Sequence, residues 1–581
     1  MYDPSDGETD ADMSETGRVV EVLERSAHAR PRVFERVIDW FEPARTVLLV
    51  CIVVWTAWFW RLPLVRHEQF GTFGFDLGIY DQGVWLLSQF RDPFVTVRGM
   101  DLFGHHMNVF LLALAPFYRL GAGVELLLGV QLIAQASGAF AMFLLGRDVL
   151  RSRWCGVALG VALLLNPTYQ WLMWEFFHPD AVAIGPLLFA YWAARERRWG
   201  WFAVAALVAL SCKEDVGLAV VVLGLILAFR LRGDARRLVF GFGAIALGAL
   251  VPVVGDGARW AFVVGGALVL AGVVIVLRRR TDWRIGAGIA VIAGAWFTVA
   301  TQVLIPHFNG VGRFYDNFFG PELGNSPGEI ARNIAQHPSL AYDRMTESSR
   351  VEWYWKMLAP FAVLPLLYLR AFAIAVPMVA VNVLTLYPYT RDYRFHYSAL
   401  ALAGCAVATV EGIAWLQRLT SGNTIVRNVA VGIVVAASLG TTIAWGASPL
   451  ARDYDEVWPL EPSSHRTAQE IAVRLVPDRA AVSAPYNLVP HLTHREHVYE
   501  FPVPWCNINW GVEGENLDDP AGVEWLVLDR RLLGADRALA DDLLAREFTV
   551  RFEENDIIAA ERTVSVPPRT DPVAVGRCEI R

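Results

Sequence analysis

Long apolar runs recur through residues 46–445 of this chain and are separated only by short polar breaks. A helical run rises about 1.5 Å per residue, so about 20 residues cross the roughly 30 Å hydrocarbon core of a bilayer. The composition agrees, because 55% of the 581 residues are hydrophobic, 19% are charged and the mean hydropathy is +0.36. A soluble protein would bury such a surface only with difficulty. We therefore expect a mainly α-helical, polytopic transmembrane bundle in contact with the lipid bilayer.

Charge and cysteine content argue against several other classes of protein. The formal net charge is −7, whereas nucleic-acid binding needs clustered Lys and Arg that face phosphate groups. Nucleic acid is therefore not an expected partner. Six Cys in 581 residues exclude a disulfide-stapled scaffold and a CxxC metal site.

Short basic breaks set the expected orientation in the membrane. The positive-inside rule places Arg-rich loops in the cytoplasm, and a polar turn between each neighbouring pair of breaks allows an even number of crossings. We expect about 13 helices in a multi-pass protein of the plasma membrane, with a cytoplasmic N-terminus and a tail outside. The basic breaks lie at residues 147–153, 195–198, 230–237, 278–284, 370 and 418–427.

The sequence divides into three regions. Residues 1–45 are polar, without an evident signal peptide, and we expect a cytoplasmic segment that is partly disordered. Residues 46–446 form the transmembrane region, with a long outer loop at 61–122. Residues 447–581 carry more charge and shorter apolar runs, which is typical of a small extracytoplasmic α/β domain.

Within this C-terminal region, residues 480–483 and 525–528 are typical of strands and residues 465–475 of a helix. Cys506 and Cys578 are its only cysteines. A disulfide between them is expected in an oxidising compartment, and two unpaired thiols are the alternative.

Two aspartates, Asp76 and Asp81, follow the first apolar run. They are five positions apart, which is about 140° around a helix, so they would not share a face. We interpret one as a candidate catalytic carboxylate and the other as structural. Alternatively, Asp76 is only the N-cap of a helix that runs to Phe90.

A possible metal set lies further along the same loop. If this stretch is helical, Asp101 and His105 are four positions apart and meet on one face, and His106 follows. Carboxylate and imidazole are ordinary ligands, so a divalent metal could bind this pair together with Asp76. A hydrogen-bonded histidine pair is the alternative. The sequence suggests no other cofactor.

Two later turns carry most of the remaining ionisable groups. The apolar stretch before the second turn, residues 201–212, has 12 residues and reaches only about 18 Å, so the following charges should lie below the outer surface. Ionisable groups at such a depth are functional candidates. Capping turns and a self-neutralised ion cluster are the alternatives. The candidate substrate-binding residues are Glu175, His178, Asp180, Lys213, Glu214 and Asp215.

Three arginines lie beside aromatic residues in the expected outer loops, namely Arg313, Arg391 and Arg394. A guanidinium group can bind two phosphate oxygens at once, so such arginines suit a phosphate headgroup. Solvated loop charge is the alternative.

These features resemble the glycosyltransferase C superfamily (GT-C), whose members use polyprenyl-phosphate-linked sugars. The shared features are a cytoplasmic N-terminus, a first helix followed by a long acidic outer loop, short polar outer turns and an extracytoplasmic C-terminal domain. More closely, four motifs are similar to those of the membrane family called domain of unknown function 2079. They are Phe75-Asp-Leu-Gly-Ile-Tyr-Asp-Gln82, Phe177-His-Pro-Asp180, Lys213-Glu-Asp215 and Val489-Pro-His-Leu-Thr-His-Arg495.

The GT-C resemblance implies a membrane glycosyltransferase that moves a sugar, with inversion, from a polyprenyl-phosphate donor to an extracytoplasmic glycan, lipid or protein. It assigns the general base, or a metal-placing carboxylate, to the first outer loop: Asp76 by position, and Asp81 second. Lys213, Arg391 and Arg394 would supply positive charge to the departing phosphate. The first loop departs from the pattern because it lacks paired adjacent acids.

Two other functions compete with this one. A flippase or solute transporter would place its site near the midplane, which the Lys213-Glu-Asp215 turn favours and the lack of an internal repeat disfavours. A non-catalytic envelope assembly protein would use the C-terminal domain, where His491, His494, Arg495 and His497 could bind a ligand or metal.

Overall fold

The computed structural model describes residues 42–229, 244, 251, 259–277, 283–310, 318–506, 518–564, 573–575 and 578–580. Most of the expected cytoplasmic segment, residues 1–45, lies outside this part of the chain. So do Arg313, the basic break at 230–237 and residues 278–282.

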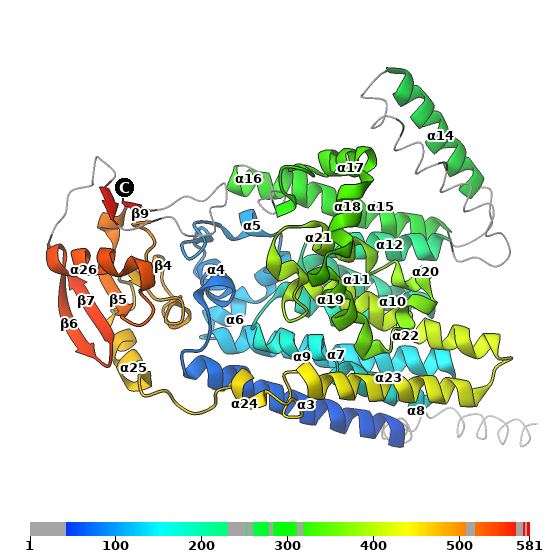
Figure 1. Cartoon of the computed structure of the whole chain (residues 1–581), viewed down its shortest axis with the longest axis horizontal. Coiled ribbons are helices and arrows are strands. Elements are labelled where there is room, and N and C mark those ends of the chain that lie inside the picture. Colours follow the sequence, from blue (N-terminus) through cyan, green and yellow to red (C-terminus); the bar gives the residue numbers. More distant parts are fainter. Residues whose placement is uncertain are drawn as a thin grey trace, which may run out of the picture.

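Helices make up most of the protein, and a small β-sheet lies at one end of its long axis (Figure 1). Within the described residues, five helical segments are long and apolar enough to cross a membrane. They are Pro43–Glu68, Val124–Leu150, Arg284–Asn309, His396–Leu419 and Thr424–Trp445. The predicted mainly α-helical membrane bundle with a small C-terminal α/β domain is confirmed.

The bundle combines long helices with shorter ones that polar turns interrupt. Asn166 shows the cause: its side chain accepts a hydrogen bond from the Tyr169 amide, and Pro167 follows at the first helical position, as is usual at a helix start. The bundle helices are α3 (Pro43–Glu68), α7 (Val124–Leu150), α8 (Arg153–Leu164), α9 (Pro167–Trp174), α10 (Pro179–Arg195), α11 (Trp199–Cys212), α12 (Val216–Ala228), α14 (Arg259–Leu277), α15 (Trp283–Val299), α22 (Ala399–Leu419) and α23 (Thr424–Trp445).

Shorter helices connect and cover these elements. They are α4 (Ile79–Ser88), α5 (Leu102–His105), α6 (Ala115–Arg119), α16 (Ile305–Asn309), α17 (Pro327–Gln336), α18 (Pro338–Thr346), α19 (Ser348–Leu358), α20 (Leu369–Phe372), α21 (Val376–Leu384), α24 (Tyr454–Val457), α25 (Arg466–Leu475) and α26 (Arg537–Arg546).

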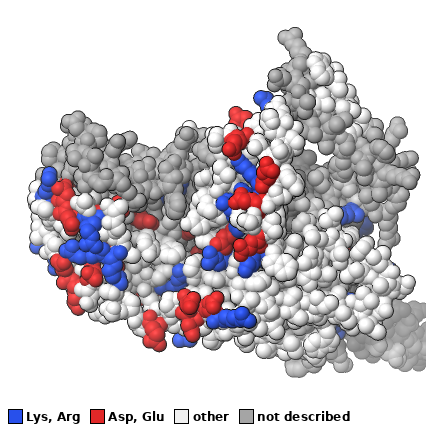
Figure 2. Space-filling view, in the orientation of Figure 1, with Lys and Arg blue, Asp and Glu red and all other residues white. Residues whose placement is uncertain are grey.

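The outer surface of the bundle suits contact with lipid. Helix α3 exposes Val50, Val53 and Val54, and helix α23 exposes Ile425 and Val429. On the face in Figure 2, charged side chains gather over the C-terminal domain and over the region of α17 to α19, whereas the surface over α23 is largely uncharged. Apolar side chains exposed along a helix are stable against hydrocarbon and costly against water.

Small residues let the helices approach closely. Gly146 of α7 meets Gly156 of α8, where a Cβ added to Gly146 would lie 2.9 Å from the Gly156 Cα. Gly185 of α10 is tighter still, because its Cβ would lie 2.2 Å from the Ala134 carbonyl oxygen and 2.4 Å from the Ser137 hydroxyl. Close backbone contact of this kind provides the packing attraction between helices in a membrane.

The C-terminal domain is built on a five-stranded sheet in the order β4-β3-β5-β7-β6. Strand β3 pairs in parallel with β4 and β5, and β7 pairs antiparallel with β5 and β6. Strand β5 is buried along its whole length because it is central. The bounds are β3 (Val482–Ala484), β4 (Val498–Glu500), β5 (Trp525–Asp529), β6 (Phe548–Glu554) and β7 (Ile557–Arg562), with two-stranded pairs at β1 (Phe94–Val95) with β2 (Met100–Asp101) and β8 (Val573–Val575) with β9 (Cys578–Ile580).

Four cysteines of the membrane region, Cys51, Cys155, Cys212 and Cys405, are free thiols. Cys506 of the C-terminal domain is disulfide-bonded. Its expected partner, Cys578, lies among the residues whose side chains the structure does not describe, so the pairing stays a prediction, as do the region boundaries at 46 and 447.

A buried hydrogen-bond network joins the first loop (residues 69–123) to the C-terminal domain. Asp81 of α4 accepts a hydrogen bond from the Tyr118 hydroxyl at 2.6 Å and another from the Thr493 hydroxyl, and it lies 3.3 Å from the His494 ring. Gln82 donates to the Glu496 carbonyl at 3.0 Å. Asp81 therefore connects two regions that are far apart in the sequence.

The pKa values of Asp81 and His494 follow from these contacts. Although burial alone would raise it, His494, Thr493 and Tyr118 hold the pKa of Asp81 below its ordinary value of 3.8. Burial would lower the pKa of His494, but Asp81 raises it above its ordinary value of 6.5, with a further contribution from Glu125 against Arg495. The folded protein therefore favours the charged pair.

The substitution Gly185→Ala should lower the free energy of unfolding by about 1–3 kcal/mol, because the added methyl group must push α10 away from α7. Gly432→Ala on α23 is the matched control, since a Cβ there meets nothing within 4 Å. The unfolding temperatures of both variants in lipid nanodiscs check this expectation. Equal temperatures for the two variants would contradict the close contact.

The Asp81–His494 pair should make stability depend on pH in both directions. The contribution of Asp81 is complete above pH 3.8 and is lost as pH falls through its lowered folded pKa. That of His494 is complete below pH 6.5 and is lost as pH rises through its raised folded pKa. The difference in unfolding temperature between wild type and Asp81→Asn should therefore be larger at about pH 6 than at about pH 9.

The partly exposed pair Asp392–Arg394 provides the control for this pH series, because it contains no histidine. Asp392→Asn should differ from wild type by a small amount that does not change between about pH 6 and about pH 9. A wild type to Asp81→Asn difference that is equally flat would rule out the His494 contribution.

Candidate functional site

A cavity of about 470 Å³ lies where the first loop meets the turns of the bundle. Its ionisable lining comes from the first loop, from the turns after α9 and α11, and from the segment just before α22. Its apolar lining comes largely from α15, α17 and α21. The polar residues include Asp76, Tyr80, Arg98, His105, His106, His178, Asp180, Lys213, Asp215 and His396, and the apolar ones include Phe297, Phe318, Ile330, Ile334, Met378, Val381 and Leu384.

Asp76 enters this cavity from a strained loop. Its backbone has φ 68° and ψ −87°, close to the rare γ-turn values of about +75° and about −65°. A non-glycine residue in this region costs about 1–3 kcal/mol and marks a functional candidate. The Gly74 amide donates to the Tyr486 carbonyl at 2.6 Å, which ties the loop to the C-terminal domain.

The alternative that Asp76 is only an N-cap is wrong. Helix α4 begins at Ile79, its N-cap is Gly78, and no side chain caps it. The Asp76 side chain is about one third exposed, at 32%, and its Oδ1 lies 3.5 Å from Nε2 of His178. Asp81 does not line the cavity. The two aspartates thus have different surroundings, and only Asp76 faces a space that a substrate could enter.

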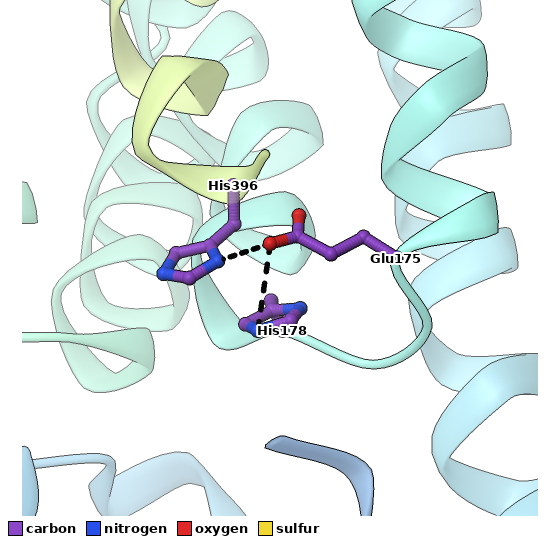
Figure 3. Close-up of side chains that lie close together, drawn as sticks. All are labelled: Glu175, His178 and His396. Atoms are coloured by element: carbon purple, nitrogen blue, oxygen red, sulfur yellow. Dashed lines mark hydrogen bonds and ion pairs between the residues drawn. The ribbon is translucent and has the colours of Figure 1, made fainter. Parts of the chain in front are cut away.

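Glu175, His178 and His396 form a buried cluster beside Asp76 (Figure 3). The first two lie in the turn between α9 and α10, and His396 lies just before α22. The Glu175 Oε1 atom lies 2.7 Å from Nδ1 of His396 and 3.9 Å from Nε2 of His178. The two imidazole rings stack with centroids 3.9 Å apart.

The turn that carries this cluster is fixed by Gln131 of α7. The Gln131 amide group donates to the Phe176 carbonyl at 2.7 Å and to the Leu172 carbonyl at 2.8 Å, and its oxygen accepts from the His178 amide at 2.7 Å. One buried side chain therefore holds both ends of the turn in place.

The pKa values of the turn residues reflect their surroundings. Burial raises the pKa of Glu175 to about 8. Burial alone would lower the pKa of His178, but the carboxylates of Glu175 and Asp76 raise it to about 9. The pair therefore holds more protons near neutral pH than the same groups would hold in water.

In the Lys213-Glu-Asp215 turn, which follows helix α11, Lys213 and Glu214 are buried. Nζ of Lys213 lies 3.2 Å from Oδ2 of Asp180. Glu214 lies 2.8 Å from Nδ1 of His106 and accepts a hydrogen bond from the Met107 amide at 3.0 Å. The two turns and the first loop thus meet in one network of opposite charges.

The predicted metal set of Asp101, His105 and His106 does not come together as a ligand cluster. Asp101 caps helix α5, where its side chain accepts from the Phe103 amide at 2.7 Å. Within the described residues, the one group with metal-ligand spacing is Glu175, His178 and His396. His396 was not among the predicted site residues, although the polar segment from residue 389 to 397 was a signal that could have identified it.

The positive charges of the cavity differ from those expected. Arg394 pairs with Asp392 at 2.7 Å, and Arg391 donates to the Leu386 carbonyl at 3.4 Å; neither lines the cavity. Arg98, which the sequence analysis missed, is buried there, with its guanidinium 5.7 Å from the centroid of the Phe75 ring. A lone arginine in an apolar stretch of the first loop was the available signal.

The histidines and arginine of the C-terminal motif serve the fold. The His491 ring stacks on His67 with centroids 4.1 Å apart, and His494 contacts Asp81. Arg495 donates to the carbonyls of Leu492, Pro477 and Ala480. His497 lies 3.3 Å from Asp518 near the surface. These contacts connect the C-terminal domain to the first loop and close its own loops.

The chain matches the family described as "Predicted membrane protein (DUF2079)" over residues 66–559, so the resemblance seen in the motifs is confirmed. No curated protein matches. Among solved structures, ArnT from Cupriavidus metallidurans bound to undecaprenyl phosphate is similar, with 12% identity, a TM-score of 0.44, and 90% of this chain and 100% of that chain covered. The same protein in the apo state gives 14% identity, a TM-score of 0.37, and coverage of 89% and 98%.

Breaking the Lys213–Asp180 pair should destabilise the protein strongly. Lys213→Met leaves a buried carboxylate without its partner, which costs about 3–5 kcal/mol, and Lys213→Met/Asp180→Asn should restore most of this loss. Glu470→Gln, which removes an exposed ion pair with Arg466, is the control and should cost less than about 1 kcal/mol. Unfolding temperatures of the wild type and the three variants provide the measurement, and a double variant that is no more stable than Lys213→Met would exclude a coupled pair.

Proposed function

We propose that this protein, which belongs to the family of membrane proteins described as DUF2079, is a glycosyltransferase. It would move a sugar from a polyprenyl-phosphate donor to an extracytoplasmic glycan, lipid or protein. The observation that carries the proposal is the lining of one cavity, which combines carboxylates, imidazoles and cations with an extended apolar wall. A lipid-linked sugar phosphate needs each of these surfaces.

The donor would use both parts of the lining. Its prenyl chain suits the apolar side chains of α15, α17 and α21, because burying each CH2 group contributes about 0.8 kcal/mol. Its phosphate suits the end of the cavity where Lys213 and Arg98 lie. Arginine in particular can donate to two phosphate oxygens at once.

The chemistry assigned to Asp76 follows from its exposure and neighbours. An acceptor hydroxyl oxygen forms a bond to C1 of the sugar, and the bond from C1 to the phosphate oxygen breaks. The hydroxyl proton passes to the Asp76 carboxylate, and the electron pair leaves with the phosphate, with inversion at C1. Asp76 suits the base because it lines the cavity and is partly exposed, and His178 at 3.5 Å can orient it.

The cations would act on the leaving group. Negative charge builds on the phosphate as the C1–O bond breaks, and preorganised cations stabilise that charge most in a site that excludes water. Lys213 is positioned for this by Asp180, and Asp215 lines the same end of the cavity. Glu214 contributes indirectly, because it holds His106 and the Met107 amide.

The substitution Asp76→Asn should lower transfer by about 10²–10⁴-fold, the usual contribution of a general base. The assay uses purified protein, a panel of radiolabelled polyprenyl-phosphate sugars and a membrane extract as acceptor. Asp392→Asn, which changes an aspartate outside the cavity, should keep wild-type activity.

Each outcome of this assay has a clear meaning. A labelled product formed by wild type and by Asp76→Asn at equal rates would remove Asp76 from the mechanism. Lipid or sugar carried across a vesicle membrane by wild type, without any covalent product, would replace the transferase with a flippase or transporter. A further variant lacks residues 447–581. If it keeps full wild-type function, the non-catalytic assembly role of that domain is excluded.

A further inference from the structure

We infer that Glu175, His178 and His396 form a binding site for a first-row divalent transition metal, with Zn2+ as the reference ion. The three side chains come from two separate elements, the turn between α9 and α10 and the segment before α22. Each offers one ligand atom, and these atoms all lie within 4.8 Å of one another. This set is distinct from the Asp101–His105–His106 set expected from the sequence.

Burial is the first observation that favours a bound ion. Glu175 is 4% exposed, His178 1% and His396 8%. The Oε2 atom of Glu175 and the Nδ1 atom of His178 are buried without a hydrogen-bond partner in the protein. Leaving such an atom unsatisfied costs about 1–3 kcal/mol. Coordination would satisfy lone pairs that the protein itself leaves unused.

The chemistry of the donors selects the class of ion. Two imidazoles and one carboxylate are typical of Zn2+ and related ions in sites with three protein ligands, whereas Mg2+ and Ca2+ prefer oxygen alone. Three ligands leave a fourth position of a tetrahedral ion open. Asp76 lies 3.5 Å from Nε2 of His178, so the open position is on the side of the cavity.

The surrounding structure supports the ligands while leaving one adjustment to be made. Gln131 holds the turn at Leu172, Phe176 and His178 through three hydrogen bonds. The two rings stack with an interplanar angle of 13°, and ring nitrogens bind metals in the plane of the ring. Binding therefore requires one imidazole to rotate out of the stack.

The functional consequence rests on the proposed glycosyl transfer. An ion in this cluster would add positive charge beside a cavity that Lys213 and Arg98 also line and that would hold the donor phosphate. It would also place its open coordination position next to Asp76. Neither effect is needed for the binding itself, which can be measured without any substrate.

The test measures metal directly. Wild-type protein is purified without added metal and stripped with a chelator. It is then dialysed against a small excess of Zn2+ and analysed by inductively coupled plasma mass spectrometry. We expect about one Zn2+ per chain, and at least about tenfold weaker binding for Glu175→Gln and for His396→Asn. His491→Asn, which removes a partly buried imidazole outside the cluster, should bind like wild type.

A spectroscopic measurement on the wild type covers the case in which a cluster variant fails to fold. X-ray absorption at the zinc edge should show two imidazole ligands and oxygen donors in a site of four or five ligands. Fewer than two imidazoles, less than half an equivalent of bound zinc, or equal loss of zinc from His491→Asn would overturn the inference.

The two proposals can fail separately. Stoichiometric zinc in the cluster with no transfer from any donor would keep the metal site and remove the glycosyltransferase. Transfer at full rate by a protein that retains less than half an equivalent of zinc after dialysis against Zn2+ would keep the glycosyltransferase and remove the metal site.

Discussion

Charged groups in a membrane protein must be compensated by one another, and that constraint organises the centre of this protein. Lys213 forms an ion pair with Asp180, Glu214 is hydrogen-bonded to His106, and His396 is hydrogen-bonded to Glu175. Each pair joins two segments that are distant in the sequence. Because an uncompensated charge in a dry interior costs several kcal/mol, these pairs fix how the turns and the first loop meet, and the cavity is the space that remains between them.

The first loop is held on both sides by this arrangement. Towards the bundle it contributes His106 to the charge network, and towards the C-terminal domain it contributes Asp81, Gln82 and the Gly74 amide. A long loop would otherwise cover many conformations at a considerable entropic cost. Contacts on both sides stabilise the strained backbone conformation of Asp76, which an isolated loop would not maintain.

The sequence predicted the fold well, because hydropathy measures the free energy that decides it. It also identified the segments of the cavity through Asp76, Asp180 and Lys213, since ionisable groups are rare in apolar surroundings. It failed where the answer depended on direction or on distant contacts. Arg391 and Arg394 lie in the right loop but outside the cavity, because a sequence does not say which side of a turn faces inward.

Two further misses have the same origin. Asp76 has the sequence context of a helix cap, but helix α4 starts later, at Ile79, and the segment before it is bonded to the C-terminal domain through Gly74. His396 and Glu175 are 221 positions apart, so no local pattern could join them. Arg98 was visible as a charge in an apolar stretch, but its place at the cavity depends on the packing of the whole loop.

The contact between Gly74 and the C-terminal domain has a consequence for how the chain can be divided. A methyl group on Gly74 would lie 2.7 Å from the Val489 side chain, and the Gly74 amide is bonded to Tyr486. The C-terminal domain, which the sequence suggests is a separate unit, therefore contributes contacts that hold the Asp76 loop in its conformation. Removal of this domain would therefore disturb the cavity as directly as a substitution inside it.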